Sequence, residues 1–123
     1  MIYIVLNAVP IGLSTLLAIL LAQFVDRPKT LIGWLVALVS ALWLGAILAG
    51  ALILAPPKAP LWVMTVGSAV VIWAGFVVPA LATSLLMAGQ RGGRIARACL
   101  WWLLVMVVQA AVMRLIGLVP PPV

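Results

Sequence analysis

The sequence predicts an all-α integral membrane protein, a bundle of four antiparallel transmembrane helices with both termini on the outer side. Of its 123 residues, 68% are hydrophobic and only 7% are charged, whereas a soluble domain carries charge on about a quarter of its residues. Four long apolar runs alternate with short polar connections. Each run is long enough to cross the roughly 30 Å hydrocarbon core of a bilayer as a helix. We therefore expect one transmembrane domain over residues 1–123.

The first predicted span covers residues 2–25. It contains Pro10, which removes one helical hydrogen bond and predicts a bend in the first half of the helix. No positively charged segment precedes the apolar run, so we expect a retained span and not a cleaved signal. The connection at residues 26–29 is so short that the first two spans must be antiparallel neighbours.

The second predicted span, residues 30–54, carries no charge, and we expect the other spans to pack around it. Small residues recur in it at every fourth position, on one helix face where a neighbouring backbone can approach closely. These residues are Gly33, Ala37, Ala41, Gly45 and Ala49.

The third predicted span covers residues 61–89 and follows a proline-rich connection. It is longer than the bilayer requires, and Pro79 predicts a bend because it leaves the carbonyl of Gly75 without its helical donor. Gly67 and Gly75 are two four-residue steps apart, so we expect a second packing face there. The fourth predicted span covers residues 95–118.

The orientation follows from the basic residues. The first and third connections and their flanks hold five of the seven: Arg27, Lys29, Arg91, Arg94 and Arg97. The other side holds Lys58 and Arg114. The side richer in basic residues is expected to be cytoplasmic, which predicts a multi-pass protein of the cell inner (cytoplasmic) membrane.

The net charge of +6 is better explained by this topology than by nucleic-acid binding. Arg91, Arg94 and Arg97 are expected to contact the headgroups of anionic membrane lipids.

Asn7, Gln109 and Arg114 are predicted to form a polar cluster in the outer half of the bundle, where Thr65 and Ser68 also lie. Such a cluster is either a substrate or ion site, or a set of interhelical hydrogen bonds worth about 1 kcal/mol each. Arg114 lies about 26 Å along a helix from Arg97, so each could extend to its own membrane interface. The alternative for Arg114 is an ion pair or polar contact with a partner chain.

Trp43 and Trp73 fall near the middle of their spans, and each is two residues from a glycine of its small face. A two-residue step turns the ring away from that face. An indole N–H finds no acceptor in bare lipid, so we expect both rings to contact a partner: another subunit, a pigment, a quinone or an ordered lipid. The alternative is that both rings fill the bundle core.

Groups that carry chemistry are scarce. The chain has no histidine, a single cysteine (Cys99) and a single acidic residue (Asp26). No metal site and no acid–base pair can be identified, and the identity of a cofactor stays open. We therefore expect a non-catalytic accessory or structural subunit of a larger membrane protein complex. A small oligomeric transporter or channel is the alternative.

One pattern in the second half of the chain resembles a known family. It begins at Trp73-Ala74-Gly75-Phe76, continues to Leu85-Leu86-Met87 and the basic turn, and ends with Trp102 to Gly117, which includes Val107-Val108 and Met113. This pattern, about a third of the chain, resembles the last two helices of an uncharacterised bacterial four-helix membrane protein family. The glycine-aromatic-proline pattern of that family's first helix is absent. The resemblance implies a fold and no activity.

Overall fold

The computed structural model describes residues 2–56 and 58–120, and its regular elements over these residues are all helices. They are α1 (Ile2–Leu6), α2 (Ala8–Ala22), α3 (Leu31–Leu54), α4 (Leu61–Ile72), the π-helical turn η1 (Trp73–Val77), α5 (Val78–Met87) and α6 (Gly92–Ile116).

Three helical segments are long and apolar enough to cross a membrane: α3, the continuous rod formed by α4, η1 and α5 (Leu61–Met87), and α6. The helix α2 is also apolar but has only 15 residues. The all-α class and three of the four predicted spans are therefore confirmed at the level of helix length and composition.

The first predicted span is broken into α1 and α2 at Asn7, whose φ and ψ are −112° and 22°. The predicted distortion is therefore present, three residues before Pro10. Pro10 lies in the first turn of α2, where a residue without an N–H is tolerated because those N–H groups have no intrahelical acceptor.

The third predicted span is interrupted by η1, where the N–H of Val78 donates to the carbonyl of Trp73, five residues earlier. Pro79 follows directly and has no N–H to continue the α-helical pattern. The irregularity expected from Pro79 thus takes the form of a π-helical turn inside an otherwise continuous rod.

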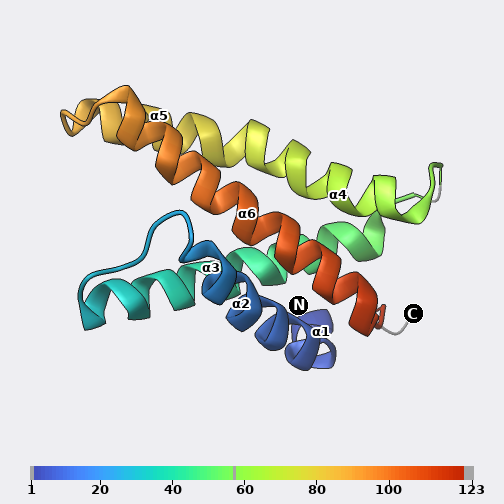
Figure 1. Cartoon of the computed structure of the whole chain (residues 1–123). Coiled ribbons are helices and arrows are strands. Elements are labelled where there is room, and N and C mark those ends of the chain that lie inside the picture. The colour runs from blue at the N-terminus through green and yellow to red at the C-terminus, as the bar shows by residue number, and fades with distance from the viewer. Residues whose placement is uncertain (1, 57, 121–123) are drawn as a thin grey trace.

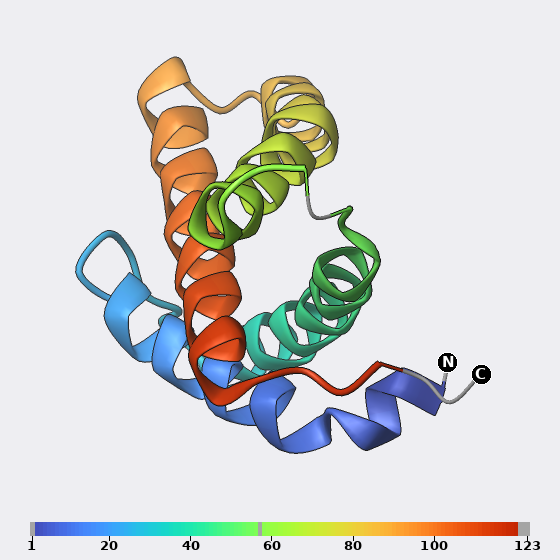
Figure 2. The same cartoon turned by 90° about the vertical axis from the view of Figure 1, so that its right-hand side faces the viewer.

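The helix α6 lies at the centre of the molecule, and not α3 as the sequence suggests. It contacts α2, α3, α4, η1 and α5, and Figures 1 and 2 show it running between the α4–α5 rod and the α2–α3 pair. Its buried residues Val105, Met106, Gln109, Ala110 and Met113 recur on one face. The long uncharged run at residues 30–54 therefore identified a helix of spanning length, but not the helix that contacts the most other helices.

The connections gather at two opposite ends. In Figure 1 the link between α2 and α3 and the link between α5 and α6 lie at the left, while the α3–α4 link and both termini lie toward the right. The helices α3 to α6 therefore run alternately in opposite directions, and the basic residues of the first and third connections share one end.

Candidate functional site

The predicted small face of α3 is buried over its second half. Ala41, Gly45 and Ala49 are buried, whereas Gly33 and Ala37 are only partly covered. A Cβ added at Gly45 would lie 2.7 Å from Gln109 Nε2 and 3.3 Å from Thr15 Oγ1. The close approach at Gly45 therefore accommodates a polar side chain of α6 and not, as expected, a helix backbone.

The expected second packing face on the third span is wrong. A Cβ added at Gly67 or at Gly75 would meet no atom within 4 Å, and Gly75 is exposed. Gly50, which the sequence analysis did not single out, is tightly packed: its added Cβ would lie 2.9 Å from the hydroxyl oxygen of Tyr3. Four-residue spacing alone does not show which small residues have a neighbour.

Gln109 occupies the centre of the bundle and is completely buried. Its Nε2 donates to the carbonyl of Ala41 at 2.8 Å and to Thr15 Oγ1 at 2.9 Å. This orientation of the amide is required because a backbone carbonyl can only accept. The other amide atom, Gln109 Oε1, is buried without a donor among the described residues.

Arg114 bonds within the chain. Its Nε donates to Thr65 Oγ1 at 2.9 Å, and its Nη2 approaches the carbonyl of Leu52 at 3.4 Å. The side chain thus joins α6 to α4 and to the last turn of α3. The bond to Thr65 joins two residues that the sequence placed in one polar cluster; it corresponds neither to extension toward the interface nor to a contact with a partner chain.

Asn7 is completely buried at the break between α1 and α2. Its Nδ2 donates to the carbonyls of Tyr3 and Val119 at 2.9 and 2.7 Å, and its Oδ1 accepts from the N–H of Val119 at 2.6 Å. We call this paired contact the Asn7–Val119 clasp. It attaches the segment that follows α6 to the first helical segment.

The three predicted polar residues therefore do not form one cluster. Each has its own partners, and no hydrogen bond joins Asn7, Gln109 and Arg114 among the described residues. Each also joins segments far apart in the sequence. This arrangement favours interhelical hydrogen bonding, one of the two interpretations of the sequence.

The two mid-span tryptophans differ. Trp73 packs against the core, and its Nε1 donates to the carbonyl of Cys99 on α6 at 2.8 Å. The expectation that its ring faces outward is therefore wrong. Trp43 is 58% exposed, as expected, and borders a shallow apolar groove between α2 and α3 of about 390 Å³.

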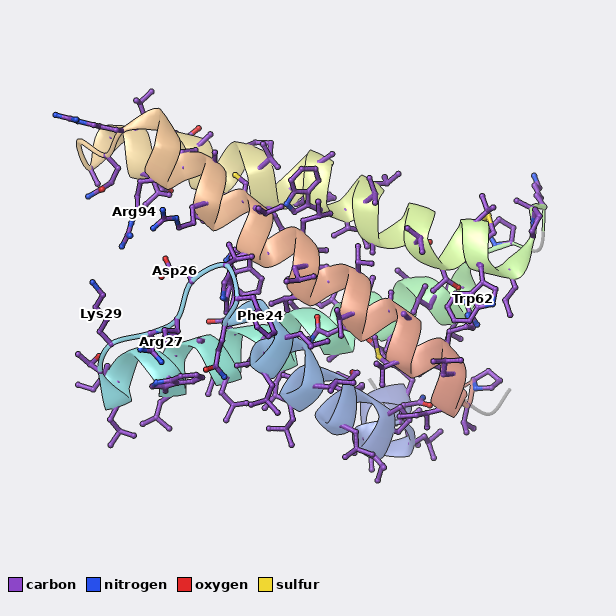
Figure 3. The ribbon with its side chains drawn as sticks, viewed as in Figure 1. Phe24, Asp26, Arg27, Lys29, Trp62 and Arg94 are labelled. Carbon is purple, nitrogen blue, oxygen red and sulfur yellow. The ribbon has the colours of Figure 1, made fainter. Side chains whose placement is uncertain are left out.

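The shared basic end of the molecule has an internal structure that the sequence did not suggest. Arg94 Nη1 lies 3.8 Å from Asp26 Oδ2, and Trp101 Nε1 donates to the carbonyl of Asp26 at 3.1 Å. Figure 3 shows Arg94, Asp26 and Lys29 pointing into one gap between α6 and α3. Arg91 and Arg97 are exposed.

Comparisons of the chain with family models, curated proteins and solved structures find no match.

Function must therefore be argued from the described residues themselves. Among them no three metal-ligating side chains come together, and Cys99 is buried without a disulfide partner. The buried polar side chains are engaged in hydrogen bonds, some within one helix and some between segments. Among the described residues, the buried side-chain atom without a partner is Gln109 Oε1. The arrangement can hold helices together and present an apolar surface with a tryptophan.

Proposed function

We propose that this protein is a non-catalytic accessory or structural subunit of a larger membrane protein complex. The proposal includes four spans in the cell inner (cytoplasmic) membrane, with both termini on the outer side and the basic end in the cytoplasm. The resemblance to the uncharacterised four-helix family enters it as a fold only.

The observation that carries the proposal is the position of Trp43. Its ring is exposed on α3 beside the groove lined by Ile4, Ala8, Ile11 and Leu42, and its N–H has no acceptor among the described residues. At this depth hydrocarbon offers no acceptor either. A transmembrane helix of another subunit that fills the groove supplies apolar contact and a carbonyl for the indole N–H.

A photo-crosslinking residue placed at Trp43 tests this proposal in the native membrane. We expect one membrane protein of defined mass to be crosslinked in near-stoichiometric amount and to copurify in mild detergent. Phe76, 73% exposed on η1, is the matched control position and should give lipid adducts only. Lipid adducts at both positions would refute the proposal.

A second candidate, a small oligomeric transporter or channel, is favoured by Gln109 Oε1, an acceptor without a donor at the centre of the bundle. Such buried oxygens are expensive in a membrane protein. This function predicts that the crosslink at Trp43 joins two copies of the same chain. It also predicts that the purified homo-oligomer transports solute in vesicles.

A further inference from the structure

We propose that the cleft at the basic end of the molecule binds one anionic phospholipid. The headgroup phosphate lies among Arg27, Lys29 and Arg94, and one acyl chain lies between α3 and α6. This inference is independent of the proposed subunit function, because it needs only that the protein resides in a bilayer.

The cleft has a volume of about 710 Å³, within the range of small-molecule sites. One wall is a single face of α3, with Ile32, Val36 and Ala37. The other wall is α6, with Ala98 and Trp102. These residues are apolar, so the body of the cleft suits a hydrocarbon chain and not a soluble ion.

The mouth of the cleft is positively charged. Arg27, Lys29 and Arg94 line it together with one carboxylate, Asp26, which leaves two positive charges in excess. Figure 3 shows Arg94 from α6 and Asp26 and Lys29 from the α2–α3 connection directed at this mouth. The negative charge of an anionic phospholipid headgroup is opposite in sign to this mouth, whereas a zwitterionic headgroup has no net charge.

The depth of the cleft matches one leaflet of a bilayer. Its α3 wall extends from Thr30 to Ser40, ten steps along the helix or about 15 Å. Half of the hydrocarbon core is also about 15 Å. A lipid held by its phosphate at the mouth therefore places its acyl chain along the apolar walls.

The cleft has a fixed shape because its parts are tied together. The Trp101 indole holds the α2–α3 connection through the carbonyl of Asp26. Trp101 and Trp102 stack edge to face with ring centroids 5.0 Å apart. Arg91 and Arg97 do not line this cleft; they border a neighbouring surface hollow that shares Arg94 with it.

Native mass spectrometry of the full chain in detergent, titrated with phosphatidylglycerol, tests the proposal. We expect one molecule bound per chain, roughly 30-fold more tightly than phosphatidylcholine with the same acyl chains, from two excess charges. Arg94→Gln should weaken binding about fivefold, and Asp26→Asn should strengthen it about fivefold. The matched control Arg97→Gln, one turn away, should leave it unchanged.

A second pair of variants tests the apolar part of the cleft, which is proposed to hold the acyl chain, without changing the charge of the protein. Ala98→Leu narrows the cleft and should abolish the one-to-one complex, whereas Ala96→Leu, at an exposed position outside the cleft, should not. Millimolar inorganic phosphate should not displace the lipid, because phosphate has no acyl chain to fill the apolar part of the cleft. Equal binding of both lipids, equal effects of Arg94→Gln and Arg97→Gln, or displacement by phosphate would each overturn the proposal.

Discussion

Replacing Gly45 by alanine tests the central contact of the bundle. The new methyl carbon would lie 2.7 Å from Gln109 Nε2, so the amide must move by roughly 0.7 Å to reach an ordinary van der Waals contact of 3.4 Å. Its hydrogen bonds to Ala41 and Thr15 are now 2.8 and 2.9 Å long. A shift of that size takes them past the favourable range of about 2.7–3.2 Å.

Two opposing contributions set the expected change in the free energy of unfolding. Crowding a packed site, with the loss of these bonds, costs about 1–3 kcal/mol, while alanine in place of glycine gains about 1 kcal/mol of helix propensity. We expect Gly45→Ala to lower the free energy of unfolding by about 1 kcal/mol. In a Gln109→Ala background the clash is absent, and the same change should raise it by about 1 kcal/mol.

The assay is equilibrium unfolding in detergent micelles, followed by far-ultraviolet circular dichroism in a double-mutant cycle. Gly67→Ala is the control because its added methyl group meets nothing within 4 Å, and it should be stabilising. If Gly45→Ala behaves like Gly67→Ala, or has the same effect with and without Gln109, the reasoning is refuted.

Three further predictions concern the ends of the bundle. Arg114→Lys should cost at most about 1 kcal/mol of unfolding free energy, because lysine keeps the charge and one donor to Thr65 or Leu52; a larger loss would show that both bonds are required. Asn7→Leu should speed hydrogen exchange of the Val119 N–H roughly tenfold by opening the clasp, and unchanged exchange would contradict it. In a Cys99→Ser background, cysteines that replace Pro28 and Gly92 should be labelled from the cytoplasm and one that replaces Lys58 from outside; labelling of position 58 from the cytoplasm alone would reverse this topology.

The long helices were predictable because length and the absence of charge alone identify them. The predicted spans at residues 30–54, 61–89 and 95–118 correspond to Leu31–Leu54, Leu61–Met87 and Gly92–Ile116. The ends differ by up to three residues because apolar residues continue past the last helical turn, and because Gly92 and Gly93 join a helix that glycine usually disfavours.

The contacts between helices were less predictable. The burial of Gly45 followed from its spacing, but its partner, an amide on α6, depends on how α6 crosses α3. Gly67 also lies on a four-residue spacing, two steps from Gly75, yet an added Cβ there would meet no atom within 4 Å. Trp73 faces inward, against the expectation from its distance to Gly75. The two-residue step does place the ring opposite Gly75, but Gly75 is exposed, so the ring faces the core; the error lay in assuming that the glycine face turns inward.

The Asn7–Val119 clasp has a consequence for biosynthesis. Its two members are 112 residues apart in the chain, which a ribosome adding about 5–20 residues per second needs roughly 6–20 seconds to cover. During that interval the first helical segment has emerged while the Asn7 amide still lacks its main acceptor and donor. The Asn7 side chain therefore has no Val119 partner until the segment after the last helix has been synthesised, and a chaperone that shields Asn7 would act in that period.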